Sequence, residues 1–131
     1  MMQANQPYRV LLVDDDDTLR DVVAEMLRSL GYEVVSAEDG SEALSIFEDG
    51  DGIHIVVTDI LMPAMDGWEL AHRIKAIKPD IPIIALTGVS PNEVFPQLNA
   101  KSIGYALFKP LRMNDLKDTL QEIVDDVQSD S

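Results

Sequence analysis

Several apolar stretches of this 131-residue sequence end at a side chain that could take part in phosphoryl chemistry. Asp14 and Asp15 follow one stretch, Asp59 follows another, and Thr87 and Lys109 follow two more. A carboxylate can attack phosphorus when a cation and an ammonium group absorb the negative charge on the phosphoryl oxygens. Clustered carboxylates with no histidine or cysteine nearby suit Mg²⁺, which prefers oxygen ligands. If the fold brings these residues together, Asp59 is the candidate nucleophile, and Lys109 and Thr87 are candidates to contact phosphoryl oxygens.

The chain must therefore contain strands that end next to these residues. Apolar, β-prone segments predict five strands, at residues 8–13, 32–37, 53–58, 81–86 and 105–108. Segments with apolar residues at helical spacing separate the strands, and a last one follows the fifth strand. This alternation predicts an α/β fold, a five-stranded parallel sheet with helices on both faces. Ligands of such sheets bind beyond the carboxyl ends of the strands, where the candidate residues lie.

Three local features lead to separate expectations. The loop at residues 62–67, marked by proline and glycine, should hold Asp59 open to solvent. Asp16 or Asp17 should cap the helix that follows the first strand. Asn114 should cap the last helix in the same way.

Composition limits the class of protein. The net charge of −14 should repel nucleic-acid phosphates and anionic lipid, so we expect no binding of nucleic acid or membranes by this chain alone. There is no cysteine, which excludes disulfides and thiolate metal sites. No apolar stretch approaches the roughly 18–20 residues of a membrane span, and the N-terminus lacks the apolar core of a signal peptide. We expect a cytoplasmic protein with a disordered lead (1–7), one folded domain (8–127) and a polar tail (128–131).

The motifs resemble those of the receiver domain of two-component response regulators over about residues 8–127. The matching pieces occur in order, each at the end of a predicted strand, and are Asp14-Asp15, the segment DILMPAMDG at 59–67, Thr87-Gly88 and Lys109-Pro110. The resemblance implies the flavodoxin-like receiver fold with strand order 2-1-3-4-5. It also implies a cis peptide bond before Pro110, which is frequent in this family.

The resemblance further implies a phosphoacceptor site. Asp59 would be phosphorylated from a histidine kinase or a histidine phosphotransfer protein in a two-component or phosphorelay system. The metal, Mg²⁺ or Mn²⁺, would be held by Asp15, Asp59 and the backbone carbonyl of Leu61, and Asp14 would support it through water. Lys109 would bind the phosphate.

The resemblance also describes how the site would signal. Thr87 would be the switch hydroxyl, and phosphorylation would change contacts with an output protein that the sequence does not identify. Such a domain is not a turnover enzyme in the usual sense, because it phosphorylates itself from a donor and then loses the group. Leu61 and Val89 flank the path of the hydrolytic water in this family, and both are apolar here. We therefore expect slow self-dephosphorylation.

The segment before Lys109 departs from the family pattern. The family commonly has an aromatic residue three positions before the lysine, whereas this chain has Ala106 there, preceded by Tyr105. Pro91 and Pro96 also interrupt the helical pattern of residues 90–102, although a proline suits the first turn of a helix. The surface that reports phosphorylation should therefore differ from that of most relatives.

Other interpretations remain open. The run 14–19 (DDDDTL) also fits the DxDxT pattern of haloacid-dehalogenase-type phosphatases, with Asp14 as nucleophile and Asp16 as acid and base. The chain is short for that family, and Asp59 would then have no role. The chain could instead be a receiver fragment of a longer regulator. Thr87, taken alone, could simply bond to neighbouring backbone.

Overall fold

Five parallel strands form the central sheet of the computed structural model, which describes residues 7–50, 52–97 and 103–129. Their spatial order is β2-β1-β3-β4-β5. The strands are β1 (Arg9–Val13), β2 (Glu33–Ala37), β3 (Ile55–Asp59), β4 (Ile83–Thr87) and β5 (Tyr105–Phe108). The helices are α1 (Asp17–Ser29), α2 (Gly40–Glu48), α3 (Gly67–Ile77), α4 (Pro91–Val94) and α5 (Met113–Ser129), with a 3-10 turn at Phe95–Gln97. The predicted α/β fold and strand order are confirmed.

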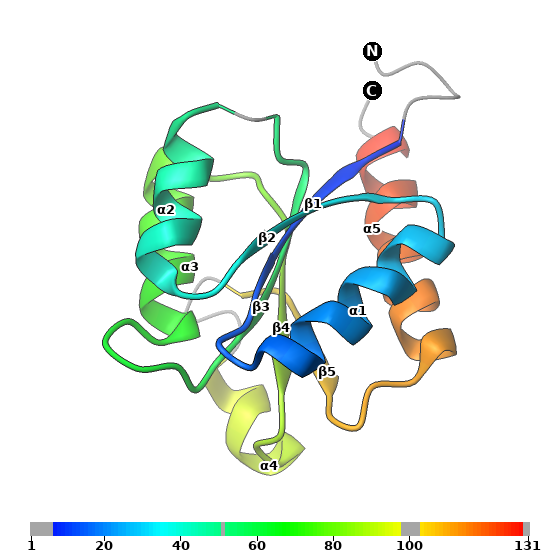
Figure 1. Ribbon diagram of the computed structural model, residues 1–131. Helices are drawn as coiled ribbons and strands as arrows, with labels where there is room; N and C mark the ends of the chain where they lie inside the picture. Colours follow the sequence, from blue (N-terminus) through cyan, green and yellow to red (C-terminus); the bar gives the residue numbers. More distant parts are fainter. Residues whose placement is uncertain (1–6, 51, 98–102, 130–131) are drawn as a thin grey trace.

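Helices cover both faces of the sheet, with α2 and α3 on one side and α1 and α5 on the other (Figure 1). Alternate strand residues belong to separate core clusters, because successive side chains of a strand point to opposite faces. In β1, Leu11 and Val13 pack with the α2 and α3 side, whereas Val10 and Leu12 pack with the α1 and α5 side. Every residue of β3 and β4 is buried, as expected for the middle of a doubly covered parallel sheet.

The register of the sheet brings the strand ends to one edge. Val13 of β1 pairs with Thr58 of β3, and Thr87 of β4 pairs with Phe108 of β5. Asp14 follows directly after β1, Asp59 ends β3, and Lys109 follows directly after β5. The fold therefore places the candidate residues along a single rim.

Aspartate side chains cap three of the helices. Asp16 accepts a hydrogen bond from the Leu19 N–H at the start of α1, with an N–O distance of 3.1 Å. Asp39 and Asp66 cap α2 and α3 in the same way. A carboxylate at this position satisfies a free N–H and interacts favourably with the helix dipole. The prediction that Asp16 or Asp17 caps α1 is confirmed for Asp16.

The predicted cap of the last helix is wrong. The helix α5 begins at Met113, so Asn114 lies within its first turn. The Leu116 N–H already bonds to the Arg112 carbonyl, at 3.1 Å. The first turn of the helix therefore begins before Asn114, and Leu116 and Leu120 are buried.

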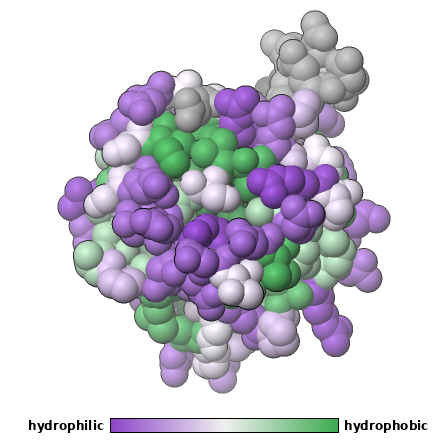
Figure 2. All heavy atoms as spheres, in the orientation of Figure 1, coloured by the Kyte–Doolittle hydropathy of each residue, from purple (hydrophilic) through white to green (hydrophobic). Residues whose placement is uncertain are grey.

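The predicted helix over residues 90–102 is short where the structure describes it. Pro91 is the first residue of α4, as its fixed backbone angle favours. Residues 98–102 of this segment lie outside the described residues. The same holds for residues 1–6 of the predicted lead (1–7) and for residues 130–131 of the predicted tail. Within the described ranges, no helix is both long and apolar enough to span a membrane. The face seen in Figure 2 is mostly hydrophilic, with hydrophobic areas between the hydrophilic ones.

His54 lies at the other end of the sheet, just before β3, and its contacts are structural. Its Nδ1 accepts a hydrogen bond from the Arg9 N–H at 2.8 Å, and its ring meets that of Tyr8 edge-on. Burial lowers the pKa of His54, and the positive charges of Lys78 and Arg9 lower it further. The neutral imidazole that this hydrogen bond requires is therefore the favoured form.

Candidate functional site

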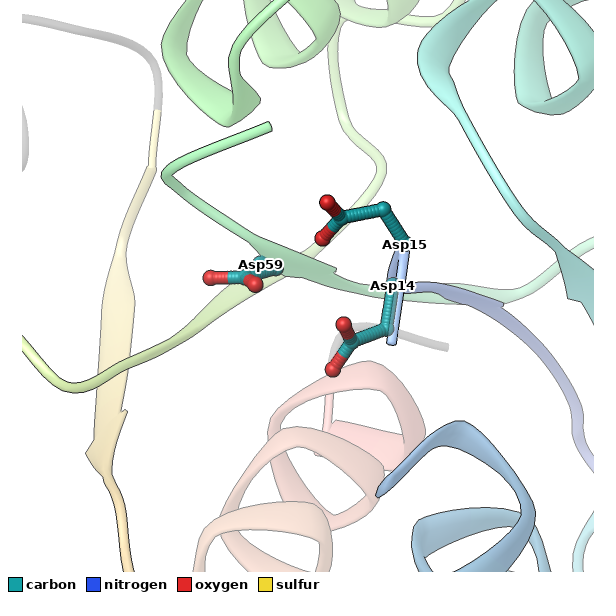
Figure 3. A group of neighbouring side chains, drawn as sticks. All are labelled: Asp14, Asp15 and Asp59. Carbon is teal, nitrogen blue, oxygen red and sulfur yellow. The ribbon is translucent and has the colours of Figure 1, made fainter. Parts of the chain in front are cut away.

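The carboxylates of Asp14 and Asp15 lean toward that of Asp59 (Figure 3). One oxygen of each lies within 4.8 Å of those of the other two. The residues come from two neighbouring strand ends, because β1 and β3 are adjacent in the sheet. Asp14 and Asp59 are buried, with 1% and 7% of their surface exposed, while Asp15 is exposed. The convergence predicted for these three residues is confirmed.

The expectation that the loop holds Asp59 open to solvent is wrong. The loop folds back on the strand end, because the Gly67 N–H at the start of α3 bonds to the Ile60 carbonyl at 2.8 Å. Ala64 adopts a left-handed backbone conformation within this loop, with a φ of 67°. The side chain of Asp59 is only 9% exposed, and the Lys109 ammonium lies against it.

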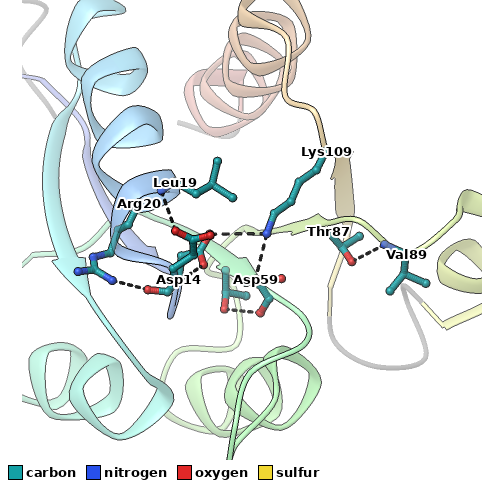
Figure 4. A network of polar contacts seen from close by, with 9 residues as sticks. Asp14, Leu19, Arg20, Asp59, Thr87, Val89 and Lys109 are labelled. Carbon is teal, nitrogen blue, oxygen red and sulfur yellow. Dashed lines mark hydrogen bonds and ion pairs between the residues drawn. The ribbon is translucent and has the colours of Figure 1, made fainter.

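Lys109 provides the positive charge of the site. Its Nζ lies 3.2 Å from Asp59 Oδ2 and 3.7 Å from Asp14 Oδ2, so one ammonium contacts two of the three carboxylates (Figure 4). The lysine side chain is 25% exposed, and it reaches the carboxylates from the end of β5. The peptide bond between Lys109 and Pro110 is cis, as the resemblance implied. The predicted place of Lys109 beside Asp59 is confirmed.

Asp14 has one satisfied and one unsatisfied oxygen. Its Oδ1 accepts a hydrogen bond from the Asp16 N–H at 2.9 Å. Its Oδ2 is buried and has no hydrogen-bond partner among the described residues. Burial raises the pKa of Asp14, and this effect outweighs the Asp16 hydrogen bond and the charge of Lys109, which lower it. The Lys109 ammonium lies 3.7 Å from this oxygen, beyond hydrogen-bond length, so the oxygen can still accept a donor or contact a cation.

The donor set fits a hard divalent cation. Three carboxylates within reach of one point offer only oxygen ligands, which is the set that Mg²⁺ prefers. The unsatisfied Oδ2 of Asp14 faces the same cluster and would gain a partner from a metal-bound water. Leu61 lies in the loop after β3 with its side chain 67% exposed. The role of its backbone carbonyl as a metal ligand stays a prediction.

Thr87 reaches the rim, but its hydroxyl oxygen is engaged by the backbone. Its side chain is fully buried at the end of β4. Its Oγ1 accepts a hydrogen bond from the Val89 N–H at 3.0 Å (Figure 4). The structure therefore has the local bond that was the alternative interpretation of Thr87. A hydroxyl that accepts one hydrogen bond keeps its own proton for donation.

Two residues of the site were missed by the sequence reasoning. In the sequence Gly67 marks a loop and ends the 59–67 motif, yet in the structure a Cβ there would collide with the Asp59 carbonyl oxygen and lie 2.9 Å from Ile60 Cα. Arg20 was not considered, although its Nη1 donates to the Asp14 carbonyl oxygen at 2.6 Å. The spacing of Asp17 and Arg20, three residues apart on one helix, was the available signal.

The phosphatase alternative does not agree with the geometry. It requires Asp16 as the partner of Asp14, but the carboxylate of Asp16 caps α1 through the Leu19 N–H. The carboxylates that do converge with Asp14 are Asp15 and Asp59. The cap holds the Asp16 carboxylate at the start of α1, and Asp16 is therefore assigned to the helix.

Comparisons with known proteins agree with one another. A sequence model of the response regulator receiver domain matches residues 10–121. The response regulator receiver protein CpdR of Brucella abortus (strain 2308) is 32% identical, over 88% of this chain and 96% of its own. The two-component response regulator-like protein PRR73 of Oryza sativa subsp. indica is 39% identical over 88% of this chain. That match spans only 15% of the rice protein.

Solved structures show the same architecture. The response regulator protein TrrA of Thermotoga maritima, in complex with Mg²⁺ and BeF, is 34% identical and superposes with a TM-score of 0.80. The superposition covers 88% of this chain and 98% of that one.

Proposed function

Because this chain belongs to the response regulator receiver domain family, we propose that Asp59 accepts a phosphoryl group from a phosphohistidine of another protein. One observation supports this role above all others: Lys109 Nζ lies 3.2 Å from Asp59 Oδ2 while two further carboxylates converge on the same residue. A lone surface acid would have neither the counter-charge nor the acidic neighbours. The donor would be a histidine kinase or a histidine phosphotransfer protein.

The residues of the site have separate tasks in this reaction. An oxygen of Asp59 forms the new O–P bond as the N–P bond of the donor breaks, and the imidazole leaves with the electron pair of that bond. The Lys109 ammonium stays beside Asp59 and neutralises charge on the phosphoryl oxygens. Asp14, Asp15 and Asp59, with the Leu61 carbonyl, would hold Mg²⁺ or Mn²⁺. When bound, the metal supplies further positive charge for the phosphoryl oxygens.

Thr87 would connect the phosphoryl group to the surface of the domain. Its hydroxyl now accepts the Val89 N–H, and a phosphoryl oxygen on Asp59 would be a stronger, charged acceptor for the threonine proton. Turning Thr87 toward Asp59 would break the bond to Val89 and free the loop after β4. Ala106 pairs with Ala85 beside this loop and has no ring to follow the movement. The change is therefore expected in the backbone between β4 and α4.

The readout would be a change in protein contacts. The net charge of −14 favours a protein partner over nucleic acid or an anionic membrane. The reaction would take place in the cytoplasm, where the phosphohistidine donors of two-component systems act.

Labelling by a small phosphodonor tests the proposal. The protein is incubated with acetyl phosphate, with and without Mg²⁺, and the product is trapped with borohydride and located by peptide mass spectrometry. We expect Mg²⁺-dependent modification of Asp59 alone. Modification at another residue, or equal labelling in the presence of EDTA, would contradict the assignment.

The lifetime of the phosphoryl group gives a further prediction. The exposed, apolar Leu61 cannot orient a water molecule toward Asp59. Replacing it by Asn should speed the loss of the phosphoryl group by about 10-fold, less than a full general base provides, because an amide positions water without removing its proton. The rate is measured as the decay of labelled protein after the donor is removed. Leu61→Met is the matched apolar control, and equal decay of both variants would sink the idea.

A further inference from the structure

Asp15 is the least constrained of the three clustered carboxylates. Asp14 and Asp59 are buried, so packing limits their side-chain directions. Asp15 is exposed, and its direction therefore depends on the backbone on either side of it. Whatever fixes that backbone decides whether the carboxylate points at the site or into solvent.

Hydrogen bonds hold the peptide units before and after Asp15. The peptide after Asp15 donates its N–H, that of Asp16, to Asp14 Oδ1 at 2.9 Å. The peptide before Asp15 has its carbonyl, that of Asp14, bound by Arg20 Nη1 at 2.6 Å. Because the peptide planes on both sides of Asp15 are fixed, the Cα–Cβ bond of Asp15 has a single direction. Arg20 provides one of these two constraints.

The guanidinium of Arg20 is itself held in place. Its Nη2 pairs with Asp17 Oδ1 at 2.6 Å, and only 14% of its side chain is exposed. The guanidinium thus spans the turn between β1 and α1. One arm bonds to the Asp14 carbonyl (Figure 4), and the other pairs with Asp17. The planar fork of arginine suits two acceptors at once, which a lysine ammonium does not reproduce in the same geometry.

We propose that Arg20 is a positioning residue of the metal site, which clamps the turn after β1 so that the Asp15 carboxylate faces Asp14 and Asp59. This inference rests on the proposed function, because it concerns the same cation. Arg20 acts through the Asp14 carbonyl and does not contact the cation itself.

The direction in which Mg²⁺ affinity changes when Arg20 is replaced distinguishes a positioning role from a purely electrostatic one. A positive charge near a cation site weakens cation binding, so its removal should tighten binding if charge alone mattered. Removing a clamp should instead weaken binding, as does the loss of other residues that orient metal ligands. Lys109 is the contrasting case, since its ammonium lies 3.2 Å from Asp59 Oδ2. Lys109→Met should therefore bind Mg²⁺ more tightly, and Arg20→Gln less tightly.

The test is Mg²⁺ titration of the metal-free full chain, followed by isothermal titration calorimetry and by the fluorescence of Trp68, the single tryptophan. Arg20→Gln should raise the Kd for Mg²⁺ by about 10-fold or more. Arg28→Gln is the matched control, because Arg28 belongs to the same helix and pairs with Glu25 three residues away, but is more exposed. Its Kd should stay within about twofold of wild type, since distant surface charges are screened.

The outcomes divide clearly. Weaker Mg²⁺ binding by Arg20→Gln, with unchanged binding by Arg28→Gln, supports the clamp. Mg²⁺ binding by Arg20→Gln that is as tight as in wild type, or tighter, overturns it. Equal weakening of Mg²⁺ binding in both variants also overturns it. Arg20→Lys keeps the charge and serves if the glutamine variant does not fold; wild-type affinity in this variant would also overturn the clamp. Labelling of Arg20→Gln should recover at saturating Mg²⁺, because Asp59 is intact. If wild type itself binds no Mg²⁺, the proposed function fails instead.

Discussion

The variant Asp59→Asn is expected to take up no measurable phosphoryl group from acetyl phosphate, a loss in rate of at least about 10⁴-fold. The substitution keeps the shape of the side chain but replaces a charged oxygen nucleophile by a neutral amide. It also leaves Lys109 without its closest ion-pair partner, at 3.2 Å in the wild type. The measurement is the initial rate of labelling at saturating Mg²⁺.

Asp66, in the loop between β3 and α3, provides a matched control. Asp66 caps α3 by accepting the Glu69 N–H at 2.9 Å, and asparagine is about as good a cap as aspartate. Asp66→Asn therefore removes one negative charge near the site without disturbing the helix, and it should label at nearly the wild-type rate. Equal labelling of Asp59→Asn and wild type would rule out Asp59 as the acceptor, and the search would turn to Asp14 and Asp15.

The second large effect is expected at a glycine. In Gly67→Ala the new methyl group would collide with the Asp59 carbonyl oxygen and lie 2.9 Å from Ile60 Cα. Both neighbours are backbone, so no side-chain rotation relieves the contact. We expect the free energy of unfolding to fall by about 1–3 kcal/mol. Labelling should also slow, because the start of α3 can move only by displacing the end of β3.

Urea unfolding and labelling rates measure the two parts of this prediction. Gly104→Ala is the control, because a Cβ at Gly104 meets no atom within 4 Å and the residue lies outside the site. Its stability should remain near that of wild type. If Gly67→Ala were as stable and as active as Gly104→Ala, the close approach of α3 to β3 would have no role in placing Asp59.

The fold and much of the site follow from local patterns. The apolar strands and the helical segments between them predict the parallel sheet. In such a sheet the carboxyl ends of the strands lie at one edge, independent of the conformation of the loops. Asp14, Asp59 and Lys109 were therefore found from their places at the ends of strands. Asp14 and Asp59 follow neighbouring strands, so the strand order alone brings them together. Lys109 follows β5, with β4 between it and Asp59, and its long side chain spans that gap.

What the sequence did not predict depends on the path of the loops and turns that follow the strands. The start of α3 approaches the end of β3 closely, because the Gly67 N–H bonds to the Ile60 carbonyl. The hydrogen bond of Thr87 to Val89 follows from the path of the loop after β4. The reach of Arg20 to the Asp14 carbonyl requires knowing how α1 is oriented against β1. No pattern of residue types along the chain contains these orientations.

The unsatisfied Oδ2 of Asp14 has a consequence for how this protein would evolve or be engineered. At the acidic rim the residues needed for the reaction are not those that would make the fold most stable. The clustered carboxylates lower the stability of the metal-free protein. Replacing Asp14 with a neutral residue would relieve that conflict in the metal-free protein. A selection for thermal stability alone, in a medium without divalent cations, would therefore enrich inactive variants, whereas the same selection with Mg²⁺ present would favour the aspartate.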